Sequence, residues 1–180
     1  GSITNKNRVA LVQKSSGTNQ ANALTVGTIV EINTDQPRLN DAVYDPDNQR
    51  ITYFWATSGS STINYRMYSF SGTTLTQTGS GSFSVTNLNT NYPSYFEATY
   101  NTTHDCIVFI YKTTDAGAYQ IQLIDPGTTS LTFSSNLYAF GSYNSYTGRS
   151  VECAATGAHV FAVQKVSDSR VYVRAGTISG

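Results

Sequence analysis

The sequence predicts an all-β protein of tandem four-stranded antiparallel blades, forming a β-propeller or part of one. Three observations support this. The 180 residues include 13 Tyr and 8 Phe among abundant Thr, Ser, Val and Ile, which favour pleated strands. No window carries the apolar spacing of an amphipathic helix. Apolar strands followed by polar turns recur at a period of about 50 residues, which is typical of propeller blades.

The repeat is marked by the first apolar residue of each strong strand. The four markers are Val9, Ile51, Ile107 and Val160, separated by 42, 56 and 53 residues. Five residues after the marker, three of the four copies carry a lysine: Lys14, Lys112 and Lys165, with Ala56 in the other copy. The spacing and the shared lysine indicate repetition of one structural unit.

Each copy contains the same order of predicted elements. The marker strand is followed by a polar turn and a second strand, such as "INYRMYSF" or "YQIQLID". A third, weaker strand then opens with "GTT", and a further strand leads into the next marker. One such blade buries only part of its two faces, so it needs a neighbour on each side. A β-sandwich, which does not require repeated copies, is the alternative.

The repeat divides the chain into a single all-β region with four parts. We assign a partial blade to 1–40, blades to 41–96 and 97–151, and a partial blade to 152–180. These parts amount to three and a half blades, so we expect a fragment of a longer chain or half of a dimeric propeller. In the second case two copies would close a seven-bladed ring as a homo-oligomer.

Charge and hydropathy exclude several partners. Charged residues make up 12% of the chain, and 11 basic residues balance 11 acidic ones. Phosphate binding needs an excess of Lys and Arg, so we expect no nucleic acid partner. No stretch approaches the roughly 18 apolar residues that span a bilayer, so we expect no membrane insertion. The polar start "GSITNKNR" does not resemble a signal peptide, and its Gly-Ser is a cloning remnant or the cut end of a longer chain.

The run "AVYDPDNQRITYFWATSGSSTINYRMYSFSG" (42–72) resembles the tandem repeat of phage tail and tail-fibre β-propellers. The segments "ALTVGTIV" and "VRAGTISG" resemble the end of the same repeat. The resemblance implies a non-enzymatic virion protein, extracellular in location, that serves structure or host-receptor recognition. Its implied partners are other virion proteins and a host-surface glycan or protein. A carbohydrate-binding propeller lectin and a glycan-degrading propeller enzyme are the alternative functions.

The turn "DPDN" at 45–48 carries Asp first and Pro second, which is typical of a type I turn. A calcium loop is the alternative. An EF-hand needs Gly at its sixth position and Glu at its twelfth, where this chain has Arg50 and Ala56. We therefore predict a turn and neither a metal nor another cofactor.

The stretch "HDC" at 104–106 suggests a metal ligand or a nucleophile at first sight. Two His and two Cys form no zinc set with standard spacing. Cysteine catalysis needs a base held by a third group, which the sequence does not indicate. We predict a turn histidine, a buried Cys106, no disulfide with Cys153 and no catalytic residue.

An acidic residue opens the strand before each marker, at Asp41, Glu97 and Glu152, and Arg38 and Arg149 lie three residues before two of them. If these strands line a central channel, the side chains form a partial ring at one mouth. Such a ring could bind a sugar, an ion or a substrate. The alternative is that the acids cap turns or form salt bridges between neighbouring blades.

Two aromatic residues, Trp55 and Tyr111, share one repeat position. Period-two alternation places one set of strand residues in the core and the other set partly in solvent. Exposed rings would suit stacking on sugars, whereas packing between blades is the alternative. We include both residues in the candidate ligand site.

Overall fold

The computed structural model describes residues 7–14, 24–33, 37–91, 96–114, 119–134, 138–140, 151–156, 159–165 and 171–177. These residues form strands, turns and irregular segments, and no helix occurs among them, which confirms the all-β prediction. It follows that the described ranges contain no helix with the length and apolar character to span a bilayer.

The N-terminal unit consists of two short antiparallel ribbons. They are β1 (Asn7–Val9) with β4 (Val30–Asn33), and β2 (Val12–Lys14) with β3 (Leu24–Val26). We predicted a third strand in each of the first three copies, but β5 begins at Pro37 and no third strand lies between β4 and β5 among the described residues. The N-terminal unit is therefore smaller than the units that follow.

Three larger sheets follow, each a meander in which sequential strands pair. The first contains β5 (Pro37–Asp45), β6 (Arg50–Thr57), β7 (Thr62–Ser71) and β8 (Thr74–Ser84). The second contains β9 (Phe96–Asn101), β10 (Cys106–Lys112), β11 (Tyr119–Pro126) and β12 (Leu131–Phe133), with β13 (Tyr138–Phe140) also on β11. The third contains β14 (Val151–Thr156), β15 (His159–Lys165) and β16 (Val171–Thr177).

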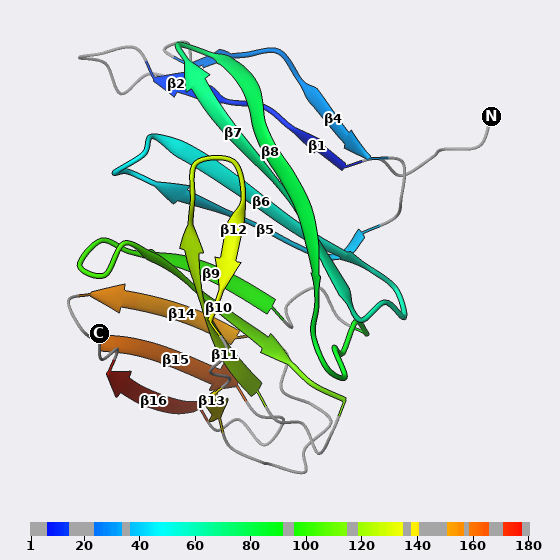
Figure 1. The fold of residues 1–180 in the computed structure, drawn as a ribbon, viewed down its shortest axis with the longest axis vertical. Helices are drawn as coiled ribbons and strands as arrows, with labels where there is room; N and C mark the ends of the chain where they lie inside the picture. The colour runs from blue at the N-terminus through cyan, green and yellow to red at the C-terminus, as the bar shows by residue number, and fades with distance from the viewer. Residues whose placement is uncertain are drawn as a thin grey trace.

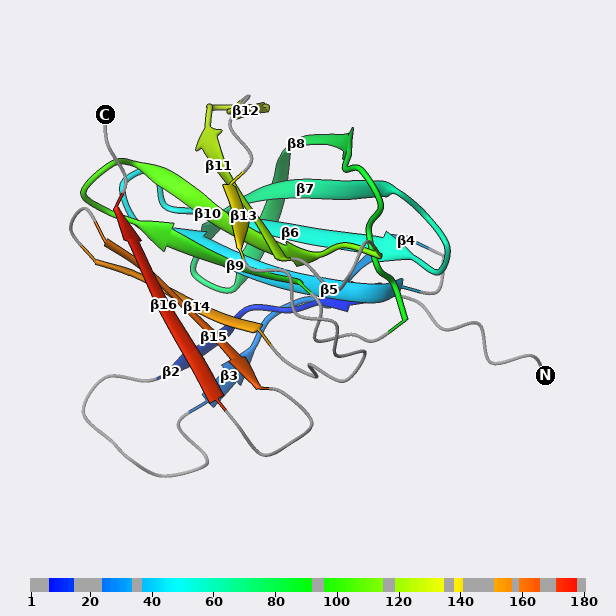
Figure 2. The same ribbon diagram turned by 90° about the horizontal axis from the view of Figure 1, so that it is seen from below.

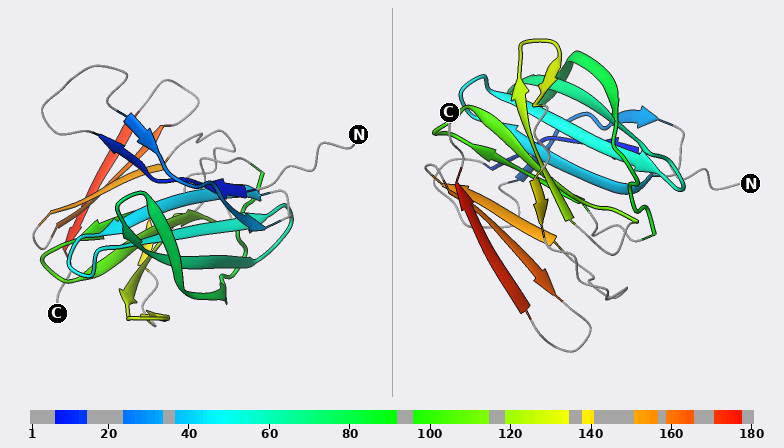
Figure 3. Two further views of the ribbon diagram at one scale, coloured as in Figure 1. Left: turned by 90° about the horizontal axis from the view of Figure 1, so that it is seen from above. Right: turned by 60° about the horizontal axis from the view of Figure 1, so that its bottom comes forward.

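The sheets follow one another in chain order along the long axis of the molecule (Figure 1). The first strands of successive sheets are neighbours, β5 beside β9 and β9 beside β14. Seen from below, these first strands lie on one side of the molecule and the last strands β8 and β12 on the other (Figure 2). The strands of the third sheet, orange and red, run at an angle to those of the first (Figure 3). More than two sheets are therefore present, unlike in the sandwich alternative.

The main core lies between the first and second sheets. Phe109 is fully buried, and its ring centroid lies 5.3 Å from that of Phe54 and 5.1 Å from that of Phe96. Phe83 and Phe133 extend the core toward the outer strands, with ring centroids 4.1 Å apart. Each buried phenylalanine contributes about 1.5–3 kcal/mol, so this aromatic layer is the main link between the two sheets.

Strand β10 is buried along its whole length, in contrast to a strand with one solvent face. Ile107, Phe109 and Tyr111 pack in the core shared with the first sheet. Val108 and Ile110 are also fully buried, and β10 contacts β14 of the third sheet. A sheet lies on each face of β10, which explains its continuous apolar sequence "CIVFIY".

The hairpin turns of the first two sheets are equivalent. The Asp45 carboxylate accepts a hydrogen bond from the Asn48 backbone N–H (3.0 Å), and the Asn101 side chain accepts one from the His104 N–H (3.1 Å). Gln49 and Asp105 adopt positive φ angles of 49° and 46°. The structure thus confirms a turn at Asp45, held by a side chain that can be Asp or Asn.

The third hairpin is shorter. In the first two hairpins four residues separate the last paired residues, whereas two separate Thr156 from His159. The acidic positions of the second and third copies are 55 residues apart and the markers 53 apart. This difference of two residues equals the shortening of the turn.

Candidate functional site

A groove of about 370 Å³ lies between the first strands of the first two sheets. Its lining comes from β5, β9 and the turns that follow them: Ala42, Val43, Tyr44, Pro46, Ala98, Thr99, Tyr100 and Thr102. Ala42 and Ala98 leave space between the two backbones. The groove therefore arises at a junction of two repeat copies.

Tyr44 forms one aromatic part of the groove. Its side chain is 47% exposed, and its ring centroid lies 6.0 Å from that of Phe70, with the rings tilted by 50°. The contact with Phe70 supports the ring from one side while solvent reaches the rest. A supported, exposed tyrosine provides an apolar surface and a hydroxyl for a ligand.

The turns at one end of the groove bring two carboxylates to one phenol. The Tyr100 hydroxyl lies 2.8 Å from an oxygen of Asp47 and also contacts Asp105. A phenol has a single hydrogen to donate, so the two carboxylates share one donor and retain free acceptor capacity. Burial raises the pKa of Tyr100, and the hydrogen bonds to Asp105 and Asp47 raise it further. The phenol is therefore protonated across the physiological range.

Asp45 lies close to Asp47 and Asp105 and is buried. Its carboxylate is 3.4 Å from the Arg50 guanidinium, which also donates to the Pro126 carbonyl (3.0 Å) and to the Gly127 carbonyl. Arg50 thereby ties the first sheet to the turn between β11 and β12. The guanidinium partly neutralises the acidic end of the groove.

The carboxylate oxygens of Asp45, Asp47 and Asp105 lie within 4.8 Å of one another, a spacing at which a cation could be held. Two features account for the cluster without an ion. Asp45 is paired with Arg50, and Tyr100 is hydrogen-bonded to the other two side chains. We therefore assign no metal to this site.

The proposed acidic ring has a different arrangement at Asp41. One carboxylate oxygen accepts the Ala98 N–H of the second sheet (2.7 Å), and the other accepts the Ala42 N–H (2.8 Å). Burial raises the pKa of Asp41, and these two backbone hydrogen bonds partly offset that rise. Asp41 thus links β5 to β9 and is engaged rather than free at a channel mouth, so of the two hypotheses the linking one describes it better.

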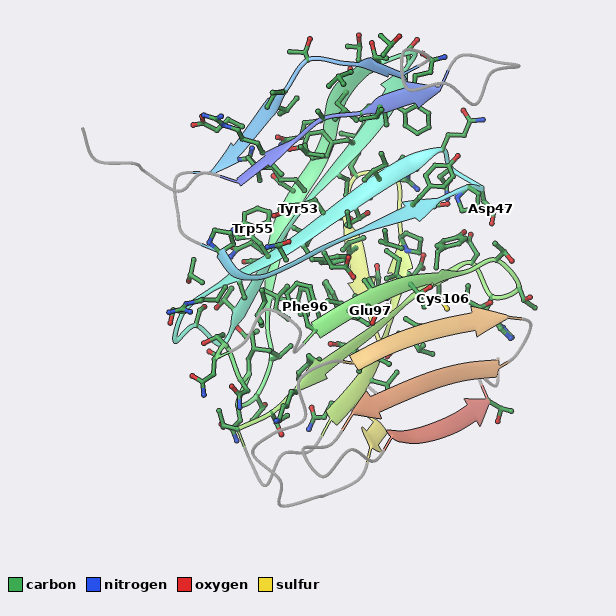
Figure 4. The ribbon with its side chains drawn as sticks, turned by 180° about the vertical axis from the view of Figure 1, so that it is seen from behind. Asp47, Tyr53, Trp55, Phe96, Glu97 and Cys106 are labelled. Atoms are coloured by element: carbon green, nitrogen blue, oxygen red, sulfur yellow. The ribbon has the colours of Figure 1, made fainter. Side chains whose placement is uncertain are left out.

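The other members of the predicted ring lie at separate places. Arg38 is exposed on β5, at the irregularity between Pro37 and Leu39. Glu97 is half-buried on β9 and has an interaction partner, and Figure 4 places it between Phe96 and Cys106. Glu152 lies on β14 in register with Val163. Arg149 lies outside the described residues, so the complete ring stays a prediction.

The exposed role considered for Trp55 and Tyr111 is wrong. Trp55 is 6% exposed and packs with Tyr53 and Ile32, and Tyr111 is fully buried and donates a hydrogen bond to Gln120 (2.6 Å). Each ring faces the preceding unit: Trp55 the N-terminal ribbons and Tyr111 the first sheet. Packing between units explains both, because a neighbouring sheet covers the face that alternation alone assigned to solvent.

The surroundings of Cys106 disfavour the nucleophilic role considered for the segment 104–106. Cys106 is unpaired and buried, as predicted. Burial raises the pKa of its thiol, and Asp105 and Asp125 raise it further, which disfavours the nucleophilic thiolate. Cys153 lies on β14 in register with Ala162. Neither cysteine therefore suggests catalysis at the groove.

Sequence reasoning did not identify the groove residues Tyr44 and Tyr100 or the carboxylates Asp47 and Asp105. A signal was present, since Tyr44 and Tyr100 each lie directly before the residue that caps the turn, Asp45 or Asn101. Figure 4 shows Asp47 and Cys106 toward the same end of their sheets, and Trp55 and Phe96 toward the other. The pairing of the two turns emerges only when the sheets are stacked.

Comparison with known proteins gives no relative: no protein-family model matches this sequence, and no curated protein matches it significantly.

Proposed function

We propose that this chain is a β-propeller element of a phage tail or tail fibre, extracellular on the virion, that serves structure and host-receptor recognition without enzymatic activity. Four features support the propeller: meander sheets in chain order, neighbouring first strands, a core between sheets, and equivalent turns. In this proposal each of the three larger sheets is one blade, and their first strands begin at Pro37, Phe96 and Val151 rather than at 41, 97 and 152. The resemblance of 42–72 to phage repeats supports the virion setting.

The observation that carries the recognition role is the groove between Tyr44 and the Tyr100 hydroxyl. It combines a supported aromatic ring with threonine hydroxyls, and two carboxylates that share one hydrogen adjoin it at the Tyr100 hydroxyl. A polyhydroxylated surface ligand matches this chemistry, because sugar hydroxyls donate to carboxylates and sugar C–H faces pack on tyrosine. Copies of the protein on one virion would add weak single contacts into firm attachment.

Binding of purified protein to an array of bacterial surface polysaccharides tests the recognition role. We expect binding that is lost in Tyr44→Ala and in Asp47→Asn/Asp105→Asn, while the exposed β5 variant Asn40→Ala retains it. Absence of binding to every surface glycan and host cell tested, or equal loss in Asn40→Ala, would contradict the proposal. Immunogold labelling of phage particles separates a virion protein from a propeller lectin of other origin.

The enzyme alternative requires a carboxyl group free to act as acid or base. Asp41 is held by two backbone N–H groups, which favours a structural role. Incubation with a bound polysaccharide and assay of new reducing ends tests this directly. Release of reducing ends that stops in Asp41→Asn or Glu97→Gln would replace the non-enzymatic proposal with the glycan-degrading one.

A further inference from the structure

The last strand of the first sheet, β8, has an open edge of unusual composition. It pairs with β7 and with no other strand that the structure describes. Its sequence "TLTQTGSGSFS" spans eleven residues, seven of which are exposed. An edge of this kind presents unpaired backbone N–H and C=O groups at alternate residues.

Proteins usually protect such an edge with charge, proline, a bulge or short length. Of the described strands with six or more residues, β8 alone contains no Lys, Arg, Asp, Glu or Pro. The last strand of the second sheet, β12, is only three residues long, and the last strand of the third, β16, carries Arg174. β8 therefore has neither the short length of β12 nor the charged residue of β16.

One of these protective features, a bulge, is present in β8. The bulge limits pairing with a strand of another chain to the regular run that follows it. The register shifts where Met67 pairs with Gly79 and Tyr68 with Gln77, so Thr78 is a bulge. From Gly79 to Ser84 the pairing with β7 continues without a shift. The face of this run toward the second sheet is covered, because Gly79 closely approaches the Thr129 carbonyl and Gly81 approaches the Tyr65 ring. Within the described part of the chain, no strand pairs with the edge itself.

We propose that the run Ser80–Ser84 of β8 pairs antiparallel with the same run of a second copy, with Ser82 opposite Ser82 of that copy, forming a two-fold symmetric dimer through a continuous sheet. The composition of β8 indicates that the strand that pairs with it comes from a second copy of the chain. An uncharged run of Gly and Ser meets its own copy without like-charge repulsion in any register, whereas an edge specific for a different chain would carry charge to select it. Antiparallel self-pairing also satisfies the two-fold symmetry of a closed dimer.

The test measures self-association by sedimentation velocity over a range of protein concentrations. We expect reversible dimers of the wild-type chain and at least about tenfold weaker association in Ser80→Glu/Ser82→Glu, because like charges meet across the new strand pair. We expect these changes to leave the stability of the monomer unchanged. Ser80 lies opposite Arg66 within the sheet, so a carboxylate at position 80 is placed favourably for the Arg66 guanidinium. The control Asn40→Glu/Ser58→Glu adds the same charge at exposed positions away from β8.

A second measurement locates the contact. Under oxidation, Ser82→Cys is expected to form a disulfide-linked dimer, and Ser58→Cys is not. A protein that stays monomeric at all concentrations overturns the proposal. So does association that weakens equally in the control variant, because the contact would then lie elsewhere.

Discussion

The two junctions made by the first large sheet differ sharply in how well they are packed. Toward the second sheet lies an aromatic core, in which Phe54 is fully buried. Toward the N-terminal ribbons the core is smaller, formed by Ile32, Tyr53 and Trp55. A hollow of about 530 Å³, lined by residues that include Leu11, Val12 and Phe70, lies at the same junction. Val12 occupies the repeat position of Phe54 and Ile110, yet it is 51% exposed while both counterparts are fully buried. Residues at equivalent positions of the repeat can therefore differ in how far they are buried.

The difference teaches what a repeat unit needs for close packing. The junction between the large sheets is also held by the Asp41 carboxylate, the Arg50 guanidinium and the Tyr100 hydroxyl, each of which contacts the neighbouring sheet. The first two belong to β5 and the start of β6, and Tyr100 belongs to β9. The N-terminal unit contributes no first strand among the described residues, so it lacks the positions equivalent to Asp41 and Tyr100.

The largest expected effect comes from the core of the well-packed junction. Phe109→Ala should lower the free energy of unfolding by about 3–5 kcal/mol, since a fully buried ring leaves a cavity. On the loose side, Val12→Ala should cost less than about 1 kcal/mol because half of the side chain is already in solvent. Urea denaturation measures both. Similar losses in the two variants would mean that the junctions are equally packed.

Glycines at the two junctions allow a second comparison. A Cβ on Gly79 would lie 2.0 Å from the Thr129 carbonyl oxygen, and one on Gly27 would lie 2.0 Å from the Thr73 carbonyl oxygen. We expect Gly79→Ala to destabilise by up to about 3 kcal/mol, because the aromatic core prevents the second sheet from moving away. Gly27→Ala should cost clearly less, since the ribbons can shift into the hollow. Equal costs in thermal unfolding would show that the ribbons are held as firmly as the second sheet.

The link from Asp41 to Ala98 gives a smaller effect with a pH signature. Asp41→Ala should destabilise by about 2 kcal/mol, because the Ala98 N–H loses its acceptor. The folded-state pKa of Asp41 is raised above its ordinary value of 3.8. Its titration therefore favours the folded state below pH 3.8 and loses that contribution as pH rises through the folded pKa.

The variant Asp41→Asn, which does not titrate, isolates this contribution. The stability of the wild type relative to Asp41→Asn should increase as pH falls from 7 toward 3.8. Denaturation of both proteins over that range measures the difference. A constant difference, or one of opposite sign, would show that burial does not control the carboxyl group.

The smallest effect concerns the two tyrosines that precede the equivalent turns. Tyr100→Phe should cost about 0.5–1.5 kcal/mol, because it removes a hydrogen bond between the first two sheets. Tyr44→Phe should leave stability unchanged, since the change keeps the ring and Tyr44 is 47% exposed. Thermal unfolding compares the pair, and equal shifts in Tm would indicate that the Tyr100 hydroxyl does not join the sheets.

Much of the fold could be predicted because strand and turn signals are local. The markers Ile51 and Ile107 both lie on the second strand of their sheets. Burial was harder, since alternation identifies the face of a strand but not what covers it, and Trp55 was therefore assigned wrongly. The third strand of the first large sheet, β8, was expected to be weak, yet it extends over eleven residues because β7 provides a long partner.

The candidate site was less predictable for a physical reason. The Tyr100 hydroxyl meets Asp47 from a turn 53 residues earlier in the chain, so their contact depends on how two sheets stack. Asp41 was identified as a repeated acid, but its role depends on which backbone N–H it reaches. These details are set by the packing of neighbouring units, which the order of residues along one strand does not encode.

Native-state hydrogen exchange tests the central claim most directly, namely that the first two sheets form one cooperative unit and the N-terminal ribbons attach loosely. We predict that the Ala98 amide, bonded to Asp41, and the amides of β10 exchange only through global unfolding. The Gly27 amide, bonded to the Leu11 carbonyl (2.8 Å), should exchange through local opening at a much lower free energy. Equal protection of Gly27 and β10 would contradict the account.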